Sequence, residues 1–221
     1  VRTLLTWVHG ALAHELPAAA TRKTAMVMAD NLAAIVAARD EPEVSKIHQL
    51  AVAEGGRAEA TIFRGPGHRT DRINAALANG IAGSWCELDE GYRLAPCHAG
   101  LYTLPAVLAE AEGLNLDVGQ TMRVLALAYE VTARIARCWV FPTMTLHPHP
   151  QTAAIGGAIA SGLARGFSVE QLGDAVNAAA TLITVGDYRH GVDGALVRNV
   201  WAAVGTANGM RAADWVRCGI G

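Results

Sequence analysis

The sequence predicts an all-α fold, a compact bundle of many helices with at most one short strand or hairpin near residues 59–63. Three observations support this prediction. Apolar residues recur at helical spacing along most of the 221 residues. Ala and Gly are the commonest residues inside these periodic stretches, and small side chains let helix axes approach closely. One short stretch alone has the pattern of a strand, and no repeat of about 20–50 residues indicates a solenoid.

The N-terminal stretch VRTLLTWVHGALAHEL is predicted to form an amphipathic helix. Leu5, Val8 and Leu12 fall on one face at helical spacing, and His9 interrupts the apolar run. A signal peptide is the alternative, because one Arg precedes a short apolar stretch that ends in Ala-Leu-Ala. No uninterrupted apolar run reaches about 18 residues, so we predict no membrane-spanning segment.

Start and stop signals divide the rest of the chain into helices. Proline is tolerated in a first turn, polar side chains cap the helix start, and glycine ends a helix. The strand candidate EATIF at 59–63 ends at the turn RGPG. Helices are expected after Pro17, from Pro42 to Gly55, from Thr70 or Asp71, from Leu101 to Ala111 with Pro105 near the first turn, from Asp117, from Gln151, from Ser168 with Gln171 as a capping box, and over about 194–217.

Composition and charge exclude several classes of partner. Of the residues, 52% are hydrophobic and 17% charged, and the net charge is −2. No basic run or interleaved aromatic patch is present, so we predict no nucleic-acid partner and no membrane partner. The four cysteines form no CxxC pair, which favours reduced thiols in a cytoplasmic protein over a disulfide or zinc framework. They are Cys86, Cys97, Cys138 and Cys218.

Three polar clusters interrupt the apolar helices, and the first is WCELDEGYRLAPCHAG at 85–100. A carboxylate where a helix ends, such as Glu87 or Asp89, can act as a general base if partial burial raises its pKa. His98 can then shuttle a proton or bind a substrate carboxylate. The alternative is that these acids simply face water. Tyr92 and Arg93 of the same stretch are candidate substrate-binding residues.

The second cluster is LHPHPQT at 146–152. His147 and His149 alternate with prolines, which predicts an extended segment whose imidazoles are not hidden in a helix. An H-x-H pair can chelate a metal, but no Cys or His elsewhere has the matching spacing, so we predict no metal site. Substrate-facing histidines are favoured, because the following helix offers free N–H groups to an anion.

The third cluster is GDYRHGVDGALVRNVW at 186–201. Arg189 or Arg198 can form a two-pronged contact with a carboxylate, the alternative being a polar surface turn followed by an ordinary helix Arg. The three clusters together supply carboxylates, imidazoles and guanidiniums without any cofactor motif. Such a set suits removal of a proton next to the carboxylate of a small acid.

Several segments resemble, in order along residues 15–221, the MmgE/PrpD family, which includes 2-methylcitrate dehydratase, cis-aconitate decarboxylase and iminodisuccinate epimerase. The segment RINAALANGIAGSWCELDEG is similar to the family's NAALANG motif and the acidic DFDD motif that follows it. CHAGLYTLPAVLAEAEG and LALAYEVTARIAR resemble two further family segments, and LHPHPQTAAIGGAIASGLARGFSVEQL resembles the helix pair that follows.

The resemblance implies a role for matching positions. The family's acidic motif falls on residues 87–90, its loop histidine on His98, its second active-site histidine on His147, and a frequent lysine on Arg198. It implies a hydro-lyase that uses neither metal nor organic cofactor, acts on a small di- or tricarboxylic acid, and forms a homodimer. The alternatives are an epimerase, isomerase or decarboxylase acting on a similar acid, or a truncated, non-catalytic helical domain that binds a partner chain.

The sequence departs from the family pattern at several points. DFDD becomes ELDE, Gly91 stands where threonine is common, and Arg198 replaces lysine. A guanidinium stays charged and cannot act as a base, although it can clamp a carboxylate. We expect residues 1–221 to form a single helical domain without the family's second, α+β domain, so a second chain or a homodimer partner would have to supply that part.

Overall fold

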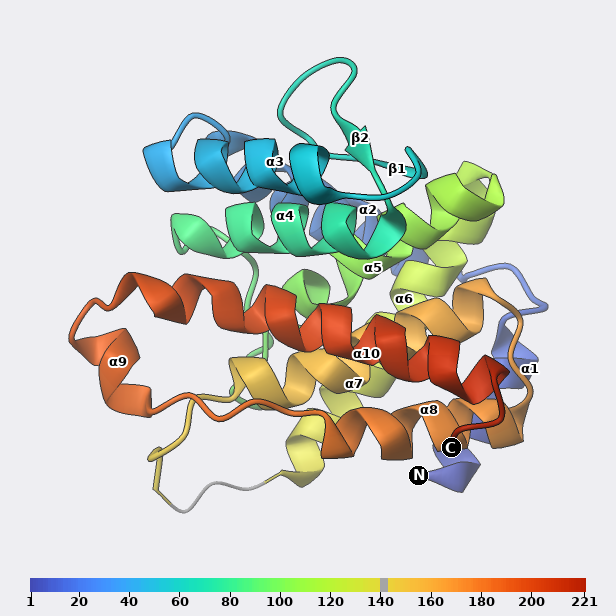
Figure 1. Ribbon diagram of the computed structural model, residues 1–221. Helices are drawn as coiled ribbons and strands as arrows, with labels where there is room; N and C mark the ends of the chain where they lie inside the picture. The colour runs from blue at the N-terminus through green and yellow to red at the C-terminus, as the bar shows by residue number, and fades with distance from the viewer. Residues whose placement is uncertain (140–142) are drawn as a thin grey trace.

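The computed structural model describes residues 1–139 and 143–221, which are almost entirely helical (Figure 1). The helices are α1 (Arg2–Ala11), α2 (Ala18–Ala37), α3 (Pro42–Glu54), α4 (Arg72–Trp85), α5 (Ala99–Leu114), α6 (Val118–Cys138), α7 (His149–Ala164), α8 (Val169–Thr181), α9 (Tyr188–Val192), the 3-10 helix η1 (Leu196–Val200) and α10 (Trp201–Arg217). Strands β1 (Ala60–Thr61) and β2 (Arg69–Thr70) pair antiparallel. The predicted all-α class with one short hairpin is confirmed. Across the described ranges, no helix has the length and apolar composition that crossing a bilayer requires.

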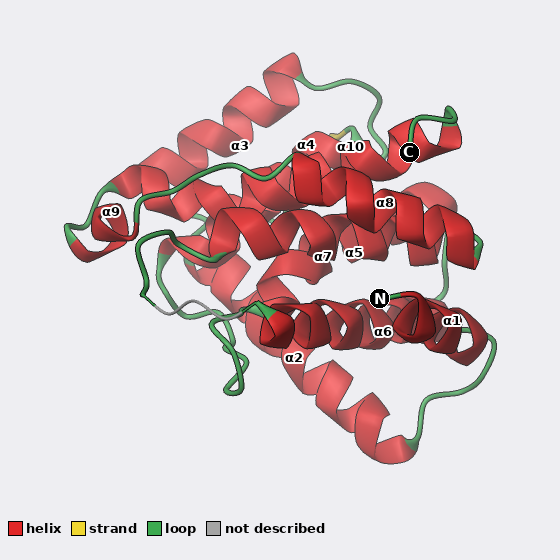
Figure 2. Ribbon diagram, turned by 90° about the horizontal axis from the view of Figure 1, so that it is seen from below, coloured by secondary structure: helices red, strands yellow, loops and turns green. Residues whose placement is uncertain are grey.

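The helices stack so that one end of the molecule gathers several helix ends. In Figure 1, α10 lies between α4 above and α8 below, and it also packs against α7 and α5. Figure 2 shows α1 and α2 alongside α6, on another side of the bundle. At the end marked by α9 in Figure 1, α4 finishes while α7 and α10 begin. The loops that carry the polar clusters therefore meet at this end.

Local capping signals fix several helix starts. The Asp71 carboxylate accepts hydrogen bonds from the backbone N–H groups at the start of α4, as predicted. Asp117 with Gln120 and Ser168 with Gln171 form reciprocal capping boxes at α6 and α8. These contacts lie within four residues of sequence, and a capping box satisfies two otherwise free N–H groups. Such starts are readable without knowledge of the tertiary structure.

Two helix starts differ from the expected ones. Helix α5 begins at Ala99, directly after His98, so Pro105 lies inside the helix and not near its first turn. The expected helix over about 194–217 corresponds to η1 followed directly by α10, so its first turns are 3-10 and not α. Gly194, whose φ is +74°, adopts a left-handed conformation that separates this helix from α9.

Helices α7 and α10 approach so closely that backbone touches backbone. A Cβ atom added to Gly157 would lie 2.1 Å from the carbonyl oxygen of Thr206, and one added to Gly209 would lie 2.0 Å from the carbonyl oxygen of Ala154. No residue with a Cβ atom fits such contacts without a shift of the helices. The small residues thus allow these two helices to pack closely, as the abundance of Ala and Gly in the sequence predicted.

Replacing Gly209 by Ala is expected to lower the free energy of unfolding by about 1–3 kcal/mol, because overpacking a tight core forces backbone shifts. Gly10→Ala is the matched control, since Gly10 is also helical and an added Cβ meets nothing within 4 Å. There the higher helix propensity of alanine should raise stability by about 0.5–1 kcal/mol. Urea unfolding of both variants checks this, and an unchanged or raised midpoint for Gly209→Ala would contradict the close contact.

A buried ion cluster joins the four helices α4, α5, α7 and α10. Glu110 of α5, whose side chain is 0% exposed, accepts hydrogen bonds from Arg72 of α4 at 2.9 Å, Ser161 of α7 at 2.9 Å and Arg165 at 2.5 Å. Arg72 also pairs with Asp214 of α10. A buried carboxylate is tolerated when its charge is paired and its oxygens are hydrogen-bonded, and both conditions hold here.

Candidate active site

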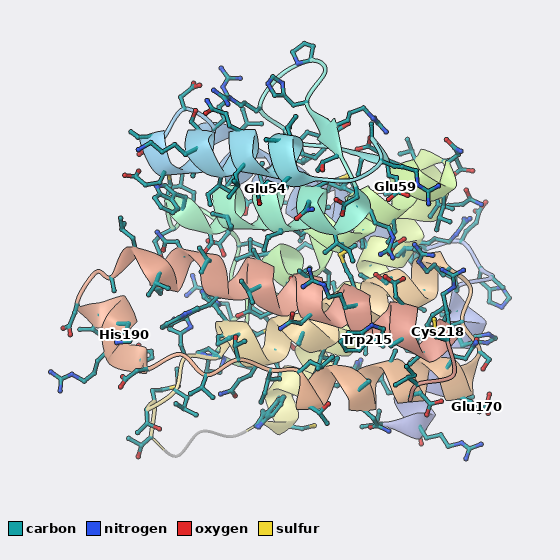
Figure 3. The ribbon with its side chains drawn as sticks, in the orientation of Figure 1. Glu54, Glu59, Glu170, His190, Trp215 and Cys218 are labelled. Carbon is teal, nitrogen blue, oxygen red and sulfur yellow. The ribbon has the colours of Figure 1, made fainter. Side chains whose placement is uncertain are left out.

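A cavity of about 400 Å³ opens at the end of the molecule where α4 finishes and α7 begins. Its wall is formed by Trp85 and Glu87, by His147, and by residues between 188 and 199 of α9 and η1. His190 of α9, labelled in Figure 3, marks this end. The cavity therefore draws on all three polar clusters, which lie far apart in the sequence.

Arg198 and Glu87 form an ion pair across this cavity. Arg198 Nη2 donates to Glu87 Oε2 at 3.0 Å, and Nη1 pairs with the other carboxylate oxygen. The arginine side chain is only 12% exposed, whereas that of Glu87 is 58% exposed. Burial lowers the pKa of Arg198, which nevertheless remains a cation. The structure thus brings two of the predicted site residues together.

Asp89 and His98 form the second predicted contact. His98 Nδ1 lies 2.6 Å from Asp89 Oδ2, and the Asp89 side chain is only 4% exposed. Burial by itself lowers the pKa of His98, but the hydrogen bond and the negative charge of Asp89 outweigh it, so the pKa is raised. The Asp89 carboxylate accepts the proton on Nδ1, which leaves Nε2 to take up or release the other proton.

Three imidazoles connect this pair to the cavity. The ring centroids of His98 and His149 are 4.9 Å apart, and those of His149 and His147 are 4.2 Å apart. His147 lines the cavity, whereas Asp89, His98 and His149 are not part of its wall. The predicted catalytic residues therefore gather in one region. The ring of His149 lies between the Asp89–His98 pair and His147, which lines the cavity.

The predicted extended segment is present only before Pro148, where Leu146 forms a β-bridge with Asp187, and His147 and His149 are both buried instead of free of helix contacts. His149 is the first residue of α7, and the prolines on either side of it occupy the helix start, where a missing N–H group costs little. Burial, and then the nearby charge of His98, lowers the pKa of His147 to about 4. Burial lowers that of His149 further, and its two imidazole neighbours add to the effect. Both rings are neutral at pH 7.

One hydrogen bond fixes where His147 carries its proton. The backbone N–H of His149 donates to His147 Nδ1 at 3.3 Å, so the neutral ring has its hydrogen on Nε2. The adjacent Cδ2 atom faces Gly191 of the cavity wall, 3.6 Å from the place a Cβ would take there. His147 therefore presents a neutral N–H donor on its cavity side.

The sequence reasoning missed several residues of this region. The Tyr102 hydroxyl lies 2.6 Å from Nδ1 of His149, and both side chains are fully buried. Tyr188 stacks on His147 with ring centroids 5.7 Å apart. Glu90, which the acidic motif at 87–90 included without a role of its own, accepts hydrogen bonds from the Gly100 backbone N–H and the Tyr129 hydroxyl. Tyr102 could have been predicted, because it follows the N-cap residue His98 by four residues, and side chains four apart lie on the same face of a helix.

Three predicted substrate-binding residues lie elsewhere. Tyr92 pairs through its backbone with Cys97 and packs edge-on against Tyr129. Arg93 and Arg189 are exposed and are not part of the cavity wall. Within residues 1–139 and 143–221, no group of three or more His, Cys, Asp and Glu side chains is placed to hold a metal ion.

Comparison with known proteins gives one match. The chain is similar to the MmgE/PrpD N-terminal domain over residues 2–221, nearly its whole length. No curated protein matches it. The order of family segments and the helical architecture described above agree with this match.

Proposed function

Because this chain belongs to the MmgE/PrpD family, we propose that it is a lyase of the hydro-lyase type that removes a proton next to a carboxylate of a small di- or tricarboxylic acid. The observation that carries the proposal is the Asp89–His98 contact of 2.6 Å. His149 connects this contact to His147, which lines the same cavity as Arg198. A carboxylate-backed imidazole is a common general base, and a buried guanidinium is a common carboxylate site.

In this proposal His98 is the base and Asp89 is its positioning residue. The Asp89 carboxylate accepts a hydrogen bond from Nδ1–H, so the neutral ring offers the lone pair on Nε2. His98 does not line the cavity, so the proposal requires the substrate to extend from Arg198 past His147 until its C–H group meets Nε2 of His98. Proton transfer leaves an imidazolium, which the same carboxylate stabilises. In a dehydration, that proton then passes to the departing hydroxyl group and leaves with it as water, which returns His98 to its neutral form.

Arg198 and His147 are placed to handle the negative charge. Removal of the proton pushes an electron pair onto the adjacent carboxylate, which becomes enolate-like. The Arg198 guanidinium would bind that carboxylate, and the neutral His147 would donate its Nε2–H to a charged oxygen. A neutral imidazole donates usefully in this way where burial keeps its pKa low. Every role in the proposal falls on a side chain of this region, without metal or organic cofactor.

Solvent proton exchange tests the proposal directly. The protein is incubated in D₂O with citrate-like, malate-like and aspartate-derived acids, and loss of the C–H signal next to each carboxylate is followed by proton NMR. Deuterium uptake with formation of an unsaturated product supports a hydro-lyase. Uptake with inversion indicates an epimerase, and loss of CO₂ indicates a decarboxylase. Absence of uptake with every acid, for protein with a native unfolding transition, would leave only the non-catalytic alternative.

The exchange rate is expected to rise with pH and to level off above the pKa of His98. The base must be neutral, and that pKa lies above its ordinary value of 6.5, so the inflection should also lie above 6.5. Initial rates between pH 6 and 9 check this. The range avoids acid unfolding: the pKa values of His48 and His147 are about 4 in the folded state, so stability falls as pH drops from 6.5 toward 4. A rate that declines across this range would contradict His98 as the base.

The assembly and location of the protein stay predictions. We propose that the helical unit works as a homodimer or with a second chain that helps exclude water from the cavity, because proton transfer next to a carboxylate gains from a dry site. We also propose that residues 1–221 form a single helical domain and that the protein is cytoplasmic.

A further inference from the structure

We propose that Glu87 is an internal competitor for the substrate: its carboxylate occupies the guanidinium of Arg198, and an incoming substrate carboxylate has to displace it. This inference rests on the proposed function for the class of ligand, a small dicarboxylate. It assigns Glu87 a role in setting affinity, in place of the role of base suggested by its sequence position.

The first support is the charge of the cavity wall. Among the described residues that line the cavity, Arg198 is the single cation and Glu87 the single anion, because His147 is neutral. The ion pair therefore leaves the cavity with no net side-chain charge. A guanidinium matches one carboxylate through two parallel hydrogen bonds; Glu87 accepts one such bond from Nη2 of Arg198, and its other carboxylate oxygen lies against Nη1. A second carboxylate on the same face would meet the negative charge of Glu87.

The second support is the unequal burial of the two partners. Arg198 is fixed in η1 with 12% of its side chain exposed, whereas 58% of the Glu87 side chain is exposed. If the contact breaks, Glu87 turns into water at little desolvation cost. Arg198 stays in the cavity wall and needs a new anionic partner, because a buried charge without one is costly. The exchange of Glu87 for a substrate carboxylate meets that need.

The third support is the backbone at Glu87. Its φ is +55°, a left-handed conformation that non-glycine residues rarely adopt. It follows Cys86, the C-cap of α4, and its own backbone N–H makes only a long hydrogen bond of 3.4 Å to the Ser84 carbonyl. The contact with Arg198 is thus made from a strained position just outside regular helix.

The test measures binding of succinate, a simple dicarboxylate, by isothermal titration calorimetry at fixed pH and ionic strength. Glu87→Gln and Glu87→Gly are expected to bind succinate at least tenfold more tightly than the unaltered protein. Glycine accepts the left-handed backbone, so the second variant guards against loss of folding in the first. Asp193→Asn is the matched control: it removes one exposed negative charge between cavity residues Val192 and Gly194, without contact to Arg198.

Arg198→Gln completes a double-mutant cycle. It should abolish succinate binding alone and in combination with Glu87→Gln. The proposal is overturned if both Glu87 variants bind succinate no more tightly than the unaltered protein, or if Asp193→Asn gives the same gain. Proton exchange is a separate readout, so tighter binding without any exchange would retain this inference and reject the proposed lyase function.

Discussion

Replacing His98 by Asn is expected to lower the rate of deuterium uptake by about 10²–10⁴-fold, the usual contribution of a general base. The side chain is partly exposed and lies at the start of α5, so the fold should persist. His14→Asn is the matched control, because His14 is exposed and remote from the cavity. The unaltered protein, both variants and their unfolding transitions are compared at pH 8. A His98→Asn variant that retains full exchange would reject the proposed base.

Asp89→Asn separates orientation from general disruption. The neutral amide can still accept the Nδ1 hydrogen bond, but it no longer raises the pKa of His98 through its charge. We therefore expect a smaller loss of rate together with an inflection moved to lower pH. A purely structural role for Asp89 would reduce the rate and leave the inflection where it was.

Replacing Glu110 by Ala is expected to lower the free energy of unfolding by about 3–5 kcal/mol, because it leaves Arg72 and Arg165 without their buried anionic partner. The two arginine side chains are only 15% and 13% exposed, so water cannot fully replace the lost carboxylate. Urea unfolding at pH 7.5 gives the difference.

Glu130→Ala is the control for this experiment. Glu130 lies on α6 and pairs with Arg134, four residues later, through side chains that are 39% and 57% exposed. Pairs of this exposure contribute about 0–1 kcal/mol. Equal effects of the two substitutions would show that burial of the ion cluster adds nothing.

Much of the fold was readable from the sequence because its signals are local. The caps at Asp71, Asp117 and Ser168 act within four residues, and helical spacing of apolar residues marks each core-facing stripe. The start of the last helix could not be predicted in this way. Gly194, just before η1, adopts a left-handed backbone, but glycine inside a helical pattern can also remain helical, as Gly157 and Gly209 do.

The candidate site was predicted only in part. The polar clusters and the family resemblance singled out the acids, His98, His147 and Arg198, but neither said which acid pairs with which base. The structure pairs Asp89 with His98, nine residues later, and Glu87 with Arg198, 111 residues later. The burial of His147 and His149 was also hidden, because a residue that precedes proline favours extended backbone unless a helix starts there.

The contact between α7 and α10 has a consequence for how new specificity can arise in this protein. Where backbone meets backbone through Gly157 and Gly209, there is no side chain whose rearrangement could absorb a change in volume. The wall of the cavity that His147 supplies, at the start of α7, is therefore held by an unyielding scaffold. The opposite wall, residues 188–199, has exposed side chains at Val192, Leu196 and Val197 and short helical turns. Adaptation to a larger or smaller acid is more open to this second wall than to the wall at His147, so selection for a new substrate should accumulate its substitutions there.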